Sequence, residues 1–218
     1  MSTERYLEFE WHTNSPGNGE SGVGLIKRIV DLVRQIENVT TICDLGCGNG
    51  YLASQLGALG YSVTGIDASK SGIDIAKSNH ANSSQSAPAT FVQSLIDKDL
   101  KSRLSLPSVD LVISSDVVEH LYRPSDLFEA AQQLLKPGGH ILVTTPYHGY
   151  LKNVVLAASG MMDNHFSALH DGGHIKFFSV RTLSTLMERH SFTNLQFSYY
   201  GRGPFVWKNM LCHGRRSN

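Results

Sequence analysis

Apolar positions follow two different periodicities along the chain, and the two alternate. Between residues 23 and 36 apolar side chains recur every three or four positions, which predicts a helix with one buried face. Residues 40–45 then form a compact, largely apolar run that ends in glycines, as a buried strand does. The alternation predicts further helices at 51–59, 69–79, 126–135 and 180–190, and further strands at 62–67, from 91, 109–114, 140–145 and 193–199.

Strands that alternate with helices are typical of an α/β fold with a mostly parallel sheet and right-handed crossovers. A length of 218 residues suits one such domain, which we place at residues 23–218. Residues 1–22 are predicted to form a flexible N-terminal arm whose aromatic side chains can dock onto an apolar surface. Residues 147–175 are predicted to be an insertion between sheet elements, on the side where a substrate would bind.

Composition narrows the choice of partners and compartment. Lys+Arg and Asp+Glu both number 19, so the chain lacks the positive field that drives nonspecific nucleic-acid binding. Three cysteines argue against a disulfide framework and indicate a reducing compartment. The N-terminus lacks a signal-peptide pattern, and no run reaches the ~20 apolar residues of a membrane span. We therefore expect a cytoplasmic protein without a nucleic-acid partner; peripheral membrane contact and oligomeric state are left open.

The loop after the first strand carries a glycine pattern at Gly46, Gly48 and Gly50. Glycines there allow a ligand to approach the backbone closely, and ligands of such sheets bind beyond the carboxyl ends of the strands. A dinucleotide fingerprint would place its third glycine where Tyr51 stands, and the charge of Asp44 would repel a phosphate. Asp67, at the end of the second strand, is positioned to accept two ribose hydroxyls. A nucleoside with a positive end and no phosphate, such as S-adenosylmethionine (SAM), satisfies both conditions.

Five segments, in this order, resemble the motifs of the class I SAM-dependent methyltransferases: 44–50 (DLGCGNG), 63–67 (VTGID), 109–112 (VDLV), 116–121 (DVVEHL) and 134–139 (LLKPGG). The resemblance implies a doubly wound, seven-stranded, mostly parallel sheet, with SAM as cofactor and S-adenosylhomocysteine (SAH) as product. It implies that Gly46 and Gly48 contact the amino-acid part of SAM, that Asp67 binds the ribose, and that Asp116 lines the methionine side. The full set of expected cofactor-binding residues is Asp44, Gly46, Cys47, Gly48, Asp67, Ala68, Gln93, Ser94, Ser115 and Asp116.

A narrower resemblance is to the O-methyltransferases of ubiquinone biosynthesis. It rests on residues 91–93, on the pair Glu119-His120, and on residues 173–178 (GHIKFF). Pro146 departs from the asparagine-containing loop of those enzymes, and Lys27-Arg28 matches their arginine-bearing N-terminal segment only weakly. The resemblance implies O-methylation of a small or lipid-like acceptor, with a quinone-precursor phenol as one example.

Methyl transfer to a hydroxyl needs a group that accepts its proton, and histidine is the usual base near neutral pH. His120 follows the fourth strand and is the first candidate, with His148 and His174 as alternatives. A purely orienting role for the Glu119-His120 pair is weighed about equally. Asp116, Glu119 and His120 would suit a divalent cation, but a solvated or capping acid pair is favoured, and no metal is predicted. A zinc site at His165, His170 and His174 is rejected because residues 171–173 break the helix between them.

Three other interpretations stay open at this stage. Residues 150–158 and 205–211 combine aromatic, basic and aliphatic side chains, which suits a membrane surface or a lipid-like acceptor, although a substrate lid and a final core strand are favoured. A noncatalytic SAM-binding protein and a nicotinamide-dependent oxidoreductase are the alternative functions. The absence of an Asn/Asp-Pro-Pro-Tyr motif after the fourth strand makes nucleic-acid bases less suitable acceptors.

Overall fold

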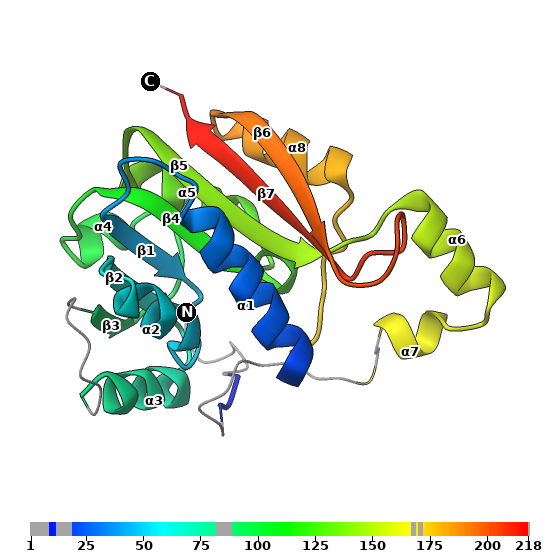
Figure 1. The fold of residues 1–218 in the computed structure, drawn as a ribbon, viewed down its shortest axis with the longest axis horizontal. Helices are drawn as coiled ribbons and strands as arrows, with labels where there is room; N and C mark the ends of the chain where they lie inside the picture. The colour runs from blue at the N-terminus through cyan, green and yellow to red at the C-terminus, as the bar shows by residue number, and fades with distance from the viewer. Residues whose placement is uncertain (1–8, 12–18, 82–88, 167–168, 170–171, 218) are drawn as a thin grey trace, which may run out of the picture.

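Seven strands form one sheet in the computed structural model, which describes residues 9–11, 19–81, 89–166, 169 and 172–217. The strand order is β3-β2-β1-β4-β5-β7-β6 (Figure 1). The first five strands of this order are parallel, whereas β7 is antiparallel to both β5 and β6. The strands are β1 (Thr41–Leu45), β2 (Ser62–Asp67), β3 (Ala89–Gln93), β4 (Val109–Ser115), β5 (Leu135–Pro146), β6 (Phe192–Tyr200) and β7 (Asn209–Arg216). The predicted doubly wound, mostly parallel sheet is confirmed.

Helices cover both faces of the sheet and bury two apolar cores. One face carries α1 (Gly19–Val33), α2 (Tyr51–Ala58) and α3 (Lys70–Ala81), and the other carries α4 (Leu100–Arg103), α5 (Ser125–Leu134) and α8 (Val180–Arg189). The helical spacing of apolar residues explains this packing: Leu25, Ile29 and Val33 of α1 are all buried against the first face. Ser179 caps α8 with a reciprocal capping box to Thr182, as the sequence predicts for the start of that helix.

Most element boundaries lie within two residues of the predictions, but three elements differ by more. The last strand is Asn209–Arg216, whereas the sequence analysis favoured a final core strand within residues 205–211. The first helix begins at Gly19, inside the stretch predicted as a flexible arm, and it ends at Val33.

The helix α5 ends at Leu134, directly before the predicted glycine-rich stop at 136–139. Those four residues already belong to β5, because the strand begins at Leu135, which pairs with Val109 of β4. A register shift between Val109 and Leu111 accommodates this early pairing.

The carboxyl ends of β1, β4 and β5 meet at one edge of the sheet, because parallel strands end on the same side. A 3-10 turn (Val118–His120) follows β4 there, and the inserted segment after β5 folds into α6 (Tyr150–Ala158) and α7 (Met162–Phe166). These two helices lie beside the connection between β6 and β7 (Figure 1). Among the described residues, no helix is long and apolar enough to cross a membrane.

Candidate functional site

The glycine loop after β1 is a tight turn whose glycines adopt left-handed backbone angles. The φ angles of Gly46, Gly48 and Gly50 are 82°, 52° and 74°, which residues with a side chain rarely adopt. The N–H of Gly46 donates to the carbonyl oxygen of Ile66 at 2.7 Å and so ties the loop to β2. A Cβ added to Gly46 would lie 2.2 Å from Val117 Cγ2, so the loop also packs closely against the segment after β4.

Asp67 links this loop to the start of α3. Its Oδ2 accepts from the N–H of Gly48 at 2.8 Å, and its Oδ1 accepts from the N–H of Ser69 at 2.7 Å. The half-buried carboxylate therefore lies directly beside the loop, in the place where the sequence motif predicts a ribose contact. Backbone donors fix its orientation before any ligand binds.

Asp44 places an unpaired acid behind the same loop. The side chain is 2% exposed, and its Oδ2 has no hydrogen-bond partner among the described residues. Burial first, and then the charge of Asp67, raise the pKa of Asp44 to about 7. A buried carboxyl group without a counter-ion suits a positively charged ligand and disfavours a phosphate. The residues present thus fit a cationic nucleoside such as SAM.

Residues 9–11 dock beside the loop, through their backbone and through the ring of Trp11; the sequence predicted docking of the arm's aromatic residues but not its place. Ser69 Oγ donates to the carbonyl oxygen of Phe9 at 2.7 Å, and the N–H of Trp11 donates to Ser71 Oγ at 3.0 Å. The indole ring of Trp11 then lies between two glycines: a Cβ added to Gly48 would be 2.3 Å from Trp11 Cζ2, and one added to Gly72 would be 2.9 Å from Trp11 Cδ1. Trp11 therefore forms an outer wall next to the loop and Asp67.

The other expected cofactor residues fall into two groups. Cys47 turns its side chain into the core on the α1 face, so only its backbone faces the loop. At the end of β3, Gln93 Nε2 donates to the carbonyl oxygen of Ala68 at 3.0 Å, and the N–H of Ser94 donates to the carbonyl oxygen of Asp67 at 2.9 Å. The structure therefore brings Ala68, Gln93 and Ser94 together beside Asp67, although they are far apart in sequence.

Asp116, which the sequence predicts at the methionine side, directly follows the carboxyl end of β4. It adopts a left-handed φ of 53°, and its Oδ1 accepts from Thr144 Oγ1 at 2.8 Å and from Asn209 Nδ2 at 3.0 Å. Ser115 lies one residue before, with its hydroxyl 3.1 Å from Thr144 Oγ1. Burial raises the pKa of Asp116, and the two hydrogen bonds partly oppose that rise. Asn209, on β7, escaped the sequence analysis because it lies 93 residues from Asp116.

His120 and His174 form one cluster with Glu119. Their rings lie 4.8 Å apart at 75°, His174 Nε2 is 4.0 Å from Glu119 Oε1, and His120 Nδ1 is 3.0 Å from the carbonyl oxygen of Gly172. Burial and the charge of Asp116 raise the pKa of Glu119 well above its usual range. One potential ligand atom from each of Glu119, His120 and His174 lies within 4.8 Å of the others. The group that could hold a divalent cation is therefore Glu119, His120 and His174. It differs from the set considered in the sequence, because His174 takes the place of Asp116.

His148 belongs to a different cluster, with His165, Phe166 and Phe177. Its ring is 5.2 Å from that of His165 and stacks on Phe166 at 5.9 Å. Burial first, and then the charge of Lys152, lower the pKa of His148 to about 4. The three histidines proposed as catalytic are therefore divided between two clusters, and His148 is neutral at physiological pH.

Replacing His148 with phenylalanine is expected to flatten the pH dependence of stability. A histidine whose pKa falls from about 6.5 in the unfolded chain to about 4 in the folded one binds more protons when unfolded. Stability is therefore lost as the pH falls from 6.5 to 4, by up to about 3 kcal/mol. Urea unfolding at several pH values measures the slope. An unchanged slope in His148→Phe would contradict this assignment, and His80→Phe serves as the control.

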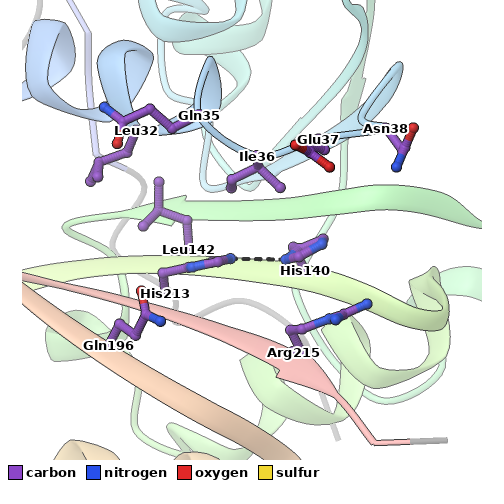
Figure 2. Close-up of a pocket in the computed structure, with 10 residues that line it drawn as sticks. All are labelled: Leu32, Gln35, Ile36, Glu37, Asn38, His140, Leu142, Gln196, His213 and Arg215. Atoms are coloured by element: carbon purple, nitrogen blue, oxygen red, sulfur yellow. Dashed lines mark hydrogen bonds between the residues drawn. The ribbon is translucent and has the colours of Figure 1, made fainter.

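A hollow of about 440 Å³ lies at the opposite edge of the sheet and is unconnected with these groups. Figure 2 shows His140 and His213 facing one another there, with Nδ1 of His140 2.9 Å from Nε2 of His213, and Arg215 beside them. His140 lies in the middle of β5, opposite Leu111 near the start of β4, whereas the candidate site lies beyond the carboxyl ends of both strands. The site is therefore defined by the loops at the carboxyl edge, not by this hollow.

Comparison with known proteins points to the same loops. A family profile described as "Methyltransferase domain" matches residues 21–197. The ubiquinone biosynthesis O-methyltransferase of Caulobacter vibrioides is 34% identical over 123 residues, which are 55% of this chain and 46% of that protein. The protein of the same name from Vibrio cholerae is 28% identical over 186 residues, 80% of this chain and 73% of that one. The chain spans about half the length of the first curated relatives it matches.

Solved structures share the fold at low sequence identity. Magnesium protoporphyrin IX methyltransferase from Synechocystis PCC 6803 with bound SAH has a TM-score of 0.66 at 17% identity, covering 89% of this chain and 82% of that one. An N-methyltransferase from Bradyrhizobium japonicum in complex with SAH has a TM-score of 0.64 at 15% identity, covering 93% and 90%. The chain therefore shares the α/β fold of these solved structures.

Proposed function

Because this chain belongs to the methyltransferase domain family, we propose that it transfers a methyl group from SAM to a small-molecule or lipid-like acceptor. The observation that carries the proposal is the glycine loop, in which Asp67 accepts from the N–H of Gly48 while the unpaired acid Asp44 lies buried behind it. This arrangement suits a nucleoside with a positive end. SAM, when bound, supplies an electrophilic methyl group on a sulfonium.

The protein's own residues would bind SAM, orient the acceptor and remove the acceptor's proton. The loop and Asp67 would hold the nucleoside, and Asp116, fixed by Thr144 and Asn209, would line the methionine side. Alignment of donor and acceptor supplies much of the rate enhancement of a direct displacement.

Oxygen is the acceptor atom that the site favours, and a phenol is the acceptor class that we propose. A hydroxyl must lose a proton as it is methylated, and His120 lies at the end of the 3-10 turn after β4 with His174 4.8 Å away. His120 is therefore the proposed base, and His174 its positioning partner. The names of the relatives from Caulobacter vibrioides and Vibrio cholerae support O-methylation.

Replacing Trp11 with alanine is expected to weaken SAH binding about fivefold. The indole forms the outer wall beside Gly48, and loss of an aromatic contact costs about 1 kcal/mol, which corresponds to about a fivefold change in affinity. Calorimetric titration measures the change, and Tyr61→Ala, which removes a half-buried ring just before β2, is the matched control. The chain has only two tryptophans, so Trp207→Phe leaves Trp11 as the sole indole, and its fluorescence should change when SAH binds. Unchanged affinity in Trp11→Ala would remove Trp11 from the site.

A further inference from the structure

Lys152 is a buried lysine without an acidic partner. It stands in the first turn of α6, is 3% exposed, and its Nζ donates to the carbonyl oxygen of Tyr147 at 2.7 Å. Among the described residues, no salt bridge joins it to a carboxylate. A buried ammonium group is costly unless it is paired, and the described residues supply no counter-ion for it.

The charged surroundings of Lys152 are positive as well. Burial first, and then the charges of Arg202 and Lys208, lower the pKa of Lys152 to about 8. Lys152 in turn helps to lower the pKa values of His148 and His165. Among the described residues, no acid contributes to any of these shifts, so this basic cluster (Lys152, Arg202 and Lys208) attracts an anion.

The basic cluster borders the acceptor side of the proposed reaction. The N–H of Tyr147 donates to the carbonyl oxygen of Lys208 at 2.9 Å, and the next residue, Asn209, holds Asp116. Aromatic rings line the same place, because Trp207 stacks on Tyr199 at 3.9 Å and meets the edge of Tyr147 at 5.3 Å. A planar ligand with an anionic substituent would satisfy both the rings and the cations.

We propose that the methyl acceptor carries a carboxylate or phosphate group and that Lys152 binds it, with Arg202 adding a second positive charge. This inference rests on the proposed methyltransferase function and names the chemical class of its acceptor. The anionic group completes the ion pair that the buried ammonium lacks, and it holds the acceptor at a fixed point away from the reacting hydroxyl. Charge-assisted hydrogen bonds to a buried ammonium are stronger than those to neutral groups.

Binding of three probes in the presence of saturating SAH tests this inference. Calorimetry at constant ionic strength compares 3,4-dihydroxybenzoate, phenyl phosphate and uncharged catechol. Wild-type protein is expected to bind at least one of the two anions tenfold or more tightly than catechol, and the preferred anion distinguishes a carboxylate from a phosphate acceptor. Lys152→Gln should bind all three alike, whereas Lys152→Arg should keep the preference. Lys98→Gln, an exposed lysine on another loop, is the matched control.

The outcomes separate the two proposals. Wild-type protein that fails to bind SAH contradicts the methyltransferase proposal itself. The inference about Lys152 is overturned if wild-type protein binds SAH but prefers neither anion over catechol. It is also overturned if that protein binds none of the three probes. Loss of SAH affinity in Lys152→Gln would reveal a damaged fold. In that case Lys152→Arg decides the question: the inference requires that this variant still bind the preferred anion more tightly than catechol.

Discussion

Asp67→Ala is expected to weaken the binding of SAM and SAH at least a hundredfold. The substitution would remove the acceptor for the ribose hydroxyls and also the carboxylate that receives the N–H of Gly48 at 2.8 Å. Hydrogen bonds to a charged group are worth about 1.5–3 kcal/mol each, and about 3 kcal/mol corresponds to a hundredfold loss of affinity. Calorimetric titration measures the change directly.

Two further variants identify the cause of that loss. Asp67→Asn keeps the size of the side chain and one acceptor oxygen, so we expect an intermediate affinity. Asp74→Asn removes an exposed acid of α3 that pairs with Lys70 and should leave SAH binding unchanged. Thermal unfolding shows whether each variant is folded. A folded Asp67→Ala protein that binds SAM normally would exclude Asp67 from the site.

His120→Ala is expected to lower kcat by about two to four orders of magnitude, the usual contribution of a general base. The side chain lies in the cluster with Glu119 and His174, and its loss should not affect the glycine loop, so SAH affinity should stay the same. Methyl transfer from radiolabelled SAM to 3,4-dihydroxybenzoate or catechol provides the rate. His174→Ala should have a smaller effect, because that residue positions His120.

His213→Ala is the matched control for this experiment. His213 is also a partly buried histidine in contact with another imidazole, but it lines the hollow at the opposite edge of the sheet (Figure 2). Its replacement should leave kcat unchanged. Equal rates for His120→Ala and the wild type would contradict the assignment of His120 as the base, which would have to be sought elsewhere.

Local patterns predicted the part of the site that local backbone geometry builds. The glycines at 46, 48 and 50 had to form a left-handed turn, and the strand that ends at Asp67 had to deliver its carboxylate to the same edge. Apolar periodicity likewise located the helices and strands to within a few residues. Such features depend on neighbours in sequence, and the pattern of residue types records them.

Contacts between distant segments were the part that the sequence did not reveal. Trp11 reaches Ser71 across 60 positions, and Asn209 reaches Asp116 across 93. The burial of Lys152 likewise depends on how α6 folds back toward the connection between β6 and β7. The sequence also could not show that His148 and His120 lie in different clusters. Both residues follow the end of a strand, and only the packing of the insertion after β5 places them apart.

The central claim, that this edge of the sheet binds SAM, is tested most directly by titrating the wild-type protein with SAM, SAH and NADH in a calorimeter. The proposed function predicts micromolar binding of SAM and SAH and no binding of NADH, since Asp44 disfavours a pyrophosphate beside the loop. Binding of NADH without SAM or SAH would contradict it and favour an oxidoreductase. Failure to bind any of the three would mean that the glycine loop is only a structural turn.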